Sequence, residues 1–110
     1  MSILPHTSSI ALTMIMPQQS ILQQLCALKP ALVRDFPVQR MALFGSVARG
    51  DATESSDIDI MVEVDPSIGL GFVTLAERLE QSLGHKVDLV SRRALKPSLW
   101  KQIEPELVDV

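Results

Sequence analysis

The sequence predicts a single α/β domain in which a small mixed β-sheet is flanked by helices. Three observations support this fold class. The chain has 110 residues, the size of one ordinary domain. Short apolar runs that are typical of strands alternate along it with longer segments of helical periodicity. Its composition, with 46% hydrophobic and 21% charged residues, excludes a disordered chain and a charge-rich tail.

The first 16 residues are expected to form a leader ahead of a domain that spans residues 17–110. Residues 1–28 contain no Asp, Glu, Lys or Arg. The apolar stretch at residues 10–16 is far shorter than the ~20 residues of a membrane span, and it lacks the basic start of a signal peptide. Met14 and Met16 are alternative starts, and a short arm docked on the core is the other interpretation.

The domain is expected to begin with a helix. Pro17 suits a first helical position, and apolar residues recur at helical spacing from residue 21 to residue 33. Pro30 lacks a backbone N–H, so we expect it to kink or restart this helix. Cys26 is expected to be a small core residue. As the single cysteine it excludes an internal disulfide, which is compatible with a reducing cytoplasm.

Two strands are expected next, joined by a loop. Residues 41–44 form an apolar run that ends at Gly45, which is typical of a buried strand. Residues 47–56 are polar and rich in turn formers, so a loop is predicted there. Residues 57–64 alternate at first, with apolar side chains on one face and carboxylates on the other. The connection is too short for a crossover helix, so we expect these two strands to be antiparallel.

The second half of the chain predicts a helix, a third strand, a last helix and an edge strand. Residues 70–83 are amphipathic at helical spacing, and Gly84 marks the end of this helix. Residues 86–90 form the third strand, and the helical connection makes it parallel to the second. Residues 97–104 are expected to form a short helix, and residues 107–110 a short edge strand.

Three carboxylates are predicted to share one face of the sheet. Asp57 and Asp59 lie two residues apart on the second strand, so they project to the same side. Val87 and Leu89 are expected to face the helices, which places Asp88 beside the first two acids. Three acids that converge from neighbouring strands are what a two-metal phosphoryl-transfer site needs, since Mg²⁺ takes oxygen ligands. For Asp88 alone, the alternative is an exposed strand acid.

The turn after the first strand fits the other half of such a site. Gly45 lets backbone N–H groups approach a phosphate closely, and Ser46 adds a hydroxyl donor. Arg49 is expected to contact phosphate or to pair with a neighbouring carboxylate. Ser56 is expected to orient the adjacent acid or to donate to phosphate. A plain strand-ending turn is the alternative for Gly45 and Ser46.

These motifs carry a resemblance to a known family. The segment GSVARGDATESSDID at residues 45–59, with VDLV at residues 87–90, closely resembles the minimal nucleotidyltransferases of the DNA polymerase β-like superfamily. The resemblance runs from about residue 21 to residue 110. It implies the fold of that superfamily, a small mixed sheet flanked by helices. It also implies nucleotidyl transfer from a nucleoside triphosphate through two Mg²⁺ ions.

The resemblance assigns roles to five residues. It implies that Gly45 and Ser46 hold the triphosphate. It implies that the metal ligands are Asp57, Asp59 and Asp88. The last of these acids is also the expected base, which accepts the proton of the attacking hydroxyl.

The same family implies a biological role. Small minimal nucleotidyltransferases are commonly antitoxins that transfer AMP from ATP to a tyrosine of a HEPN-family ribonuclease toxin. This chain contains no Tyr, so it cannot be its own tyrosine acceptor. The leading hypothesis is a cytoplasmic, Mg²⁺-dependent protein adenylyltransferase with a HEPN toxin as partner. The alternatives are a non-catalytic antitoxin and a nucleotidyltransferase that acts on a small molecule or an RNA end, although the net charge of −3 argues against direct nucleic-acid binding.

Overall fold

The computed structural model describes residues 17–110, so the predicted leader lies outside the described residues. In chain order its elements are α2 (Gln18–Asp35), β1 (Val38–Phe44), α3 (Gly45–Arg49), β2 (Ile58–Val64), η1 (Pro66–Ile68), α4 (Gly71–Leu83), β3 (Val87–Ser91), η2 (Arg92–Ala94), α5 (Pro97–Ile103), η3 (Glu104–Glu106) and β4 (Val108–Asp109). The three η elements are 3-10 turns. Across the part of the chain that is described, no helix is both long and apolar enough to cross a membrane.

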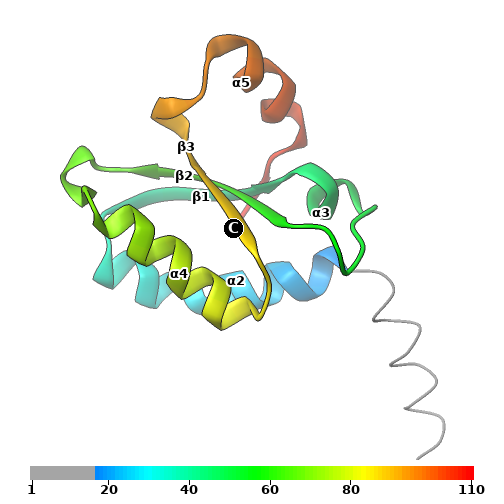
Figure 1. Ribbon diagram of the computed structural model, residues 1–110, viewed down its shortest axis with the longest axis horizontal. Coiled ribbons are helices and arrows are strands. Elements are labelled where there is room, and N and C mark those ends of the chain that lie inside the picture. The colour runs from blue at the N-terminus through cyan, green and yellow to red at the C-terminus, as the bar shows by residue number, and fades with distance from the viewer. Residues whose placement is uncertain (1–16) are drawn as a thin grey trace, which may run out of the picture.

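A mixed four-stranded sheet with the order β3-β2-β1-β4 forms the centre of the fold. Strand β1 pairs antiparallel with β2 and β4, and β2 pairs parallel with β3, as predicted. Helices α2 and α4 lie on one side of the sheet, and α5 stands on the other (Figure 1). The predicted fold class is therefore confirmed, and so are the three strands, the later helices and the short edge strand.

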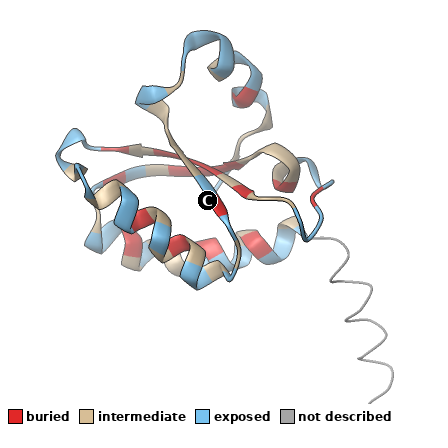
Figure 2. Cartoon of the chain, viewed as in Figure 1, coloured by how far each residue is buried: buried red, intermediate tan, exposed pale blue. Residues whose placement is uncertain are grey.

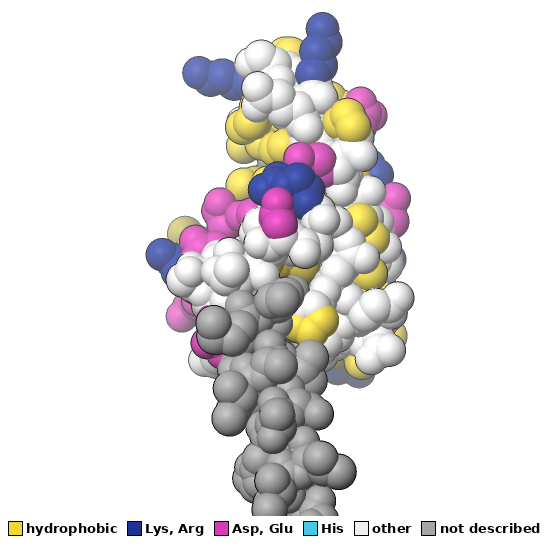
Figure 3. Space-filling model, turned by 90° about the vertical axis from the view of Figure 1, so that its right-hand side faces the viewer, with side chains coloured by type: hydrophobic (Ala, Val, Ile, Leu, Met, Phe, Trp, Pro, Cys, Tyr) yellow, Lys and Arg dark blue, Asp and Glu magenta, His cyan; other side chains and the backbone are white. Residues whose placement is uncertain are grey.

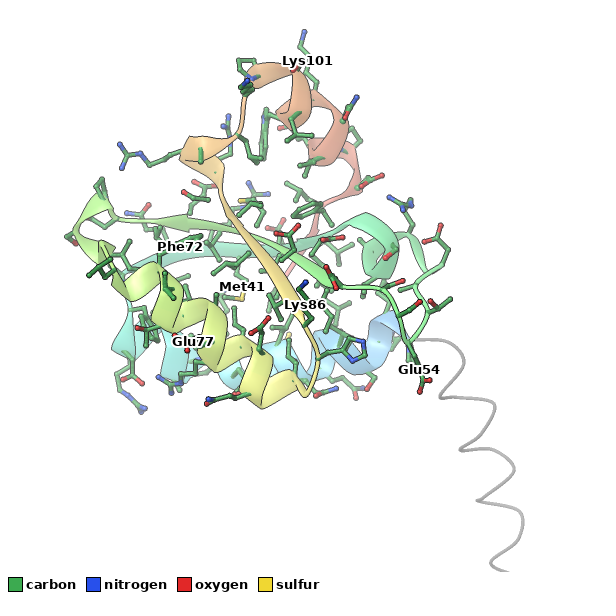
Figure 4. The ribbon with its side chains drawn as sticks, in the orientation of Figure 1. Met41, Glu54, Phe72, Glu77, Lys86 and Lys101 are labelled. Carbon is green, nitrogen blue, oxygen red and sulfur yellow. The ribbon has the colours of Figure 1, made fainter. Side chains whose placement is uncertain are left out.

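The main hydrophobic core lies between the sheet and the pair of helices α2 and α4. Every second strand residue faces this layer, including Leu43 of β1 and Ile60 of β2, and the helices contribute Leu25 and Leu79. Figure 2 shows the buried residues concentrated along the strands and the inward sides of these helices. Figure 4 places Met41 in the same layer. Burial of these apolar side chains is the main force that holds the helices on the sheet.

The opposite face of the sheet is covered only in part. Ala42 and Met61 pair across β1 and β2 on this face and are fully buried, and α5 buries Ile103 on the same side of the sheet. One row further along the strands, Asp59 is half-buried and Asp88 is exposed. The fold therefore leaves one end of this face open to solvent, and acidic residues occupy it.

Two expectations about the first helix are not met: the restart at Pro30 and the core position of Cys26. Helix α2 continues through Pro30 and does not restart there. The proline removes one hydrogen bond to the carbonyl group four residues earlier, but Leu25 and Leu32 are buried on either side of it and hold the helix against the sheet. Cys26 is exposed and is not a core residue, because it stands one position beyond the buried Leu25.

The segment predicted as a loop contains a short helix. Residues 45–49 form α3, and Gly50 ends it with a φ of +85°, which glycine adopts without strain. Val47 is fully buried in the core cluster, and this burial fixes the helix to the sheet. The apolar Val47 shortly before Gly50 is the sequence signal for this helix.

Replacing Leu25 by Ala should lower the free energy of unfolding by about 2–5 kcal/mol, because it leaves a cavity in the core. Cys26→Ala, one position along on the exposed side, is the matched control and should change it by less than about 0.5 kcal/mol. Urea unfolding followed by circular dichroism measures both values. Equal losses for the two variants would contradict the packing of α2 described above.

Candidate active site

The turn after β1 lies against the carboxylate of Asp59. Gly45 has a φ of +72°, a conformation that residues with a side chain rarely adopt. A Cβ atom on Gly45 would also overlap with Oδ2 of Asp59 and stand 3.0 Å from its Cγ, so the Asp59 side chain would have to move. The strand register produces this approach, because the preceding Phe44 pairs with Asp59. Glycine is therefore needed at this position both for its backbone conformation and for space.

The three predicted acids lie near one another at the open end of the sheet. Asp57 directly precedes β2, and Asp59 is the second residue of that strand. Asp88 of β3 is the register partner of Asp59. The side chains of Val87 and Leu89 face the core, so parity places Asp88 on the open face, as predicted.

The pKa of Asp59 reflects both its burial and the acidic side chains near it. Burial, together with the negative charges of Asp88 and Asp57, raises the pKa of the Asp59 carboxyl to about 6. The positive charge of Arg49 opposes this rise, and the negative charge of Glu106 adds to it. A carboxyl among other carboxylates ionises late because a further negative charge there is unfavourable. A bound cation would remove that penalty.

The acids do not form a closed metal cage by themselves. Within residues 17–110, no three metal-ligating side chains stand close enough together to enclose a cation. Mg²⁺ does not need such a cage, since one or two carboxylates commonly hold it and substrate phosphates and waters complete its shell. The oxygen donors of Asp57, Asp59 and Asp88, with their mutual repulsion, fit a divalent cation of this kind.

Helix α3 is held in place from two sides. The Ser46 carbonyl accepts hydrogen bonds from the N–H groups of Gly50 and Asp51, at 3.0 Å each. The side-chain amide of Gln18 on α2 donates to the Ala48 carbonyl. The half-buried Ser46 side chain thus belongs to a fixed turn that follows Gly45 directly.

Arg49 pairs with two carboxylates next to this turn. Its Nε donates to Asp51 at 3.4 Å, which is the neighbouring-acid pairing predicted as an alternative. Its Nη1 donates to Glu106 at 3.1 Å. The hydrogen bond to Glu106, and then that to Asp51, raise the pKa of the Arg49 guanidinium above its ordinary value. Figure 3, which views the α3 end of the molecule, shows basic and acidic side chains side by side there.

Of the two roles expected for Ser56, orienting the neighbouring acid is not observed, and donation to phosphate stays a prediction. Its hydroxyl accepts a hydrogen bond from the Thr53 N–H at 3.0 Å. Its own N–H donates to the Thr53 carbonyl, also at 3.0 Å. The serine therefore closes the loop before β2, and its predicted bond to Asp57 is not formed.

Glu106 joins the site although no sequence pattern predicted it. One oxygen of its carboxylate accepts from the Gly45 N–H at 3.3 Å, and the other accepts from Arg49. The pairing of β4 with β1 explains the contact, since Val108 is the partner of Leu43. Two residues further out on each strand of this antiparallel pair, Glu106 comes opposite Gly45. An acid in a short turn near the end of a chain carries no spacing signal that links it to a distant glycine.

Comparison with known sequences finds a matching domain family and related proteins. The profile of the nucleotidyltransferase domain family matches residues 25–110. The protein adenylyltransferase MntA of Thermococcus cleftensis is 43% identical over 88 residues, which cover 78% of this chain and 88% of that protein.

Solved structures share the fold. A protein described as a candidate minimal nucleotidyltransferase matches with a TM-score of 0.75 and 34% identity, over 86% of this chain and 97% of that one. A structure of the tri-AMPylated Shewanella oneidensis HEPN toxin in complex with MNT antitoxin contains a chain with 30% identity and a TM-score of 0.58. That match covers 84% of this chain and 70% of that chain.

Replacing Asp59 by Asn should stabilise the metal-free protein at pH 7.5. The pKa of Asp59 is about 6 in the folded protein and 3.8 in the reference state, so ionisation of Asp59 destabilises the fold as the pH rises through about 6. Removing this charge should raise the Tm at pH 7.5 by about 4–8 °C, the shift that ~1 kcal/mol gives in a domain of this size. At pH 4, where the wild-type carboxyl is largely protonated in the folded state, the difference should be small.

Scanning calorimetry at the two pH values checks this prediction. Glu54→Gln is the matched control, because it removes one charge from the loop before β2 at a solvent-exposed position that Figure 4 shows at the outer edge of the molecule. Mg²⁺ should raise the Tm of the wild type and so reduce the difference in Tm between the wild type and Asp59→Asn. A control variant that gains as much as Asp59→Asn would refute the electrostatic explanation.

Proposed function

The chain belongs to the nucleotidyltransferase domain family, and from this premise we propose that it transfers AMP from ATP to a protein. The observation that carries the proposal is the row of Asp59 and Asp88, in register on the open face and next to the Gly45 turn. A relative of 43% identity named protein adenylyltransferase supports AMP as the transferred group. The AMPylated toxin in a structurally similar complex supports a protein as the acceptor.

We assign the donor side of the reaction to residues of the site. Gly45, which has no side chain, lets the backbone of the turn approach the triphosphate closely, and Ser46 offers its hydroxyl. Asp57, Asp59 and Asp88 would hold the two Mg²⁺ ions, which when bound neutralise the charge of the phosphates. This assignment agrees with the raised pKa of Asp59, since a carboxylate crowded by other acids gains most from a neighbouring cation.

The residue that activates the acceptor hydroxyl is assigned from the exposure of the acids. Asp88 is exposed at the edge of the row, so it faces an incoming hydroxyl. We assign it as the base: the hydroxyl oxygen bonds to the α-phosphorus, its proton passes to Asp88, and the bond to diphosphate breaks. The net reaction of ATP and a protein hydroxyl gives AMP-protein and diphosphate.

We propose that the acceptor is a tyrosine of a HEPN-family toxin, so that the chain acts as an antitoxin. The similar chain found in complex with an AMPylated HEPN toxin supports this partner. Because the chain itself contains no Tyr, a tyrosine hydroxyl has to come from another molecule. The open end of the sheet gives such a partner access to Asp59 and Asp88. A cytoplasmic location agrees with ATP as substrate and with a single, unpaired cysteine.

Co-expression with the HEPN-family protein of the same genome should add AMP to that partner and none to this chain. Intact-mass spectrometry should show increments of AMP mass on the partner, and peptide mapping should place them on tyrosine. The double variant Asp57→Asn/Asp59→Asn should abolish the increments while the protein stays folded. The Glu54→Gln control should retain them.

Three results would contradict this proposal. AMP on this chain would show self-modification, and a silenced toxin without AMP would show an antitoxin that acts by binding alone. Labelled nucleotide found on a small molecule or an RNA end would show a different acceptor class.

Replacing Asp88 by Asn should separate catalysis from binding. If Asp88 accepts the proton, kcat should fall by about 10²–10⁴, the usual contribution of a general base, while the Kd for ATP changes much less. Single-turnover kinetics with labelled ATP, together with calorimetric titration, measure the two quantities. Equal losses in both would mark Asp88 as a metal ligand without a role as base.

A further inference from the structure

The end of the chain forms a strap across the edge of the sheet. We define the C-terminal strap as residues 104–110. Its strand β4 pairs with Ala42 and Leu43 of β1, and the Val110 N–H donates to the Met41 carbonyl at 3.0 Å. The Lys29 ammonium of α2 donates to the Val110 carbonyl at 2.6 Å. These contacts fix the strap and set the position of the turn that precedes β4.

The strap holds Glu106 between two parts of the proposed phosphate site. Its carboxylate accepts from the Gly45 N–H at 3.3 Å and from Arg49 Nη1 at 3.1 Å. The Glu106 side chain is 30% exposed, whereas that of Arg49 is 49% exposed. The more buried acid, fixed by the strap, therefore restrains the more exposed and flexible arginine.

Arg49 is held through two of the three nitrogen atoms of its guanidinium group. Its Nε is bonded to Asp51 and its Nη1 to Glu106, so two carboxylates fix the plane of the group. Among residues 17–110, Nη2 makes no hydrogen bond or ion pair. A guanidinium group has five N–H donors, so the Nη2 amino group keeps two of them for an anionic ligand.

We propose that Glu106 is a positioning residue for nucleotide binding: it holds Arg49 and the Gly45 turn in the orientation that receives the triphosphate. The inference rests on the proposed function, because it concerns the same site. An arginine that is already oriented loses less conformational freedom when it binds phosphate than a free one does. Glu106 acts through Arg49 and Gly45 and does not itself contact the nucleotide.

The test is calorimetric titration of the full-length protein with AMP-PNP in the presence of Mg²⁺, which needs no acceptor protein. Glu106→Ala should raise the Kd about tenfold, the loss expected for one charge-assisted hydrogen bond at a partly buried site. Glu106→Gln keeps one acceptor oxygen, so it should recover part of the affinity. Glu104→Ala is the matched control in the same 3-10 turn, at an exposed position, and should bind like the wild type.

A double-mutant cycle with Arg49 separates positioning from a general structural effect. If Glu106 acts through Arg49, Glu106→Ala should weaken binding far less in an Arg49→Ala background than in the wild type. Thermal melts show whether each variant is folded, and Glu106→Gln carries the comparison if the alanine variant unfolds. Full additivity in the cycle would overturn the proposal.

The other possible results of the titration distinguish a failure of this inference from a failure of the proposed function. Tighter AMP-PNP binding by Glu106→Ala would show that the carboxylate competes with phosphate, which overturns the proposal. If the wild type binds AMP-PNP and Glu106→Ala binds equally well, this inference fails and the proposed function stands. If the wild type binds no AMP-PNP, the proposed function fails and this inference fails with it.

Discussion

The register of β1 against its two neighbours determines the geometry of the site. On one side Phe44 pairs with Asp59 of β2, and on the other side Leu43 pairs with Val108 of β4. Gly45, at the end of β1, therefore meets the Asp59 carboxylate on one flank and the Glu106 carboxylate on the other. Because side chains alternate along a strand, a slip of one residue would turn Asp59 into the hydrophobic core.

The helices cover the two faces of the sheet unequally, and this leaves the acidic residues of one face accessible to a cation. Helices α2 and α4 cover one face, so the alternating apolar residues of β2 are buried there and those of β3 are buried or partly buried. On the other face α5 leaves the row of Asp59 and Asp88 open. The same packing half-buries Asp59, which disfavours its ionised form and raises its pKa. A bound cation would stabilise the ionised carboxylate.

Most of this arrangement could be predicted from local sequence patterns, and the remainder depends on long-range pairing. The position of Asp88 follows from the alternation of side chains along a strand, because Val87 and Leu89 have to face the core. The short helix α3 is not predictable from periodicity, since its five residues hold a single buried side chain, that of Val47. Glu106 could not be predicted, because its place opposite Gly45 depends on the register of a two-residue strand. The hydroxyl of Ser56 accepts a hydrogen bond within its own turn and does not bond Asp57, which is a local contact that spacing alone does not predict.

The most direct measurement of the central claim is a crystal structure of the protein with AMP-PNP and Mg²⁺. The account predicts triphosphate oxygens against the Gly45–Ser46 turn, within hydrogen-bonding distance of the Ser46 hydroxyl, and metal between the phosphates and the carboxylates of Asp57 and Asp59. A groove of about 420 Å³, lined in part by Val64, Phe72 and Arg93, lies at the other end of β2 and β3. Nucleotide bound in that groove, with no metal at the carboxylates, would contradict the account.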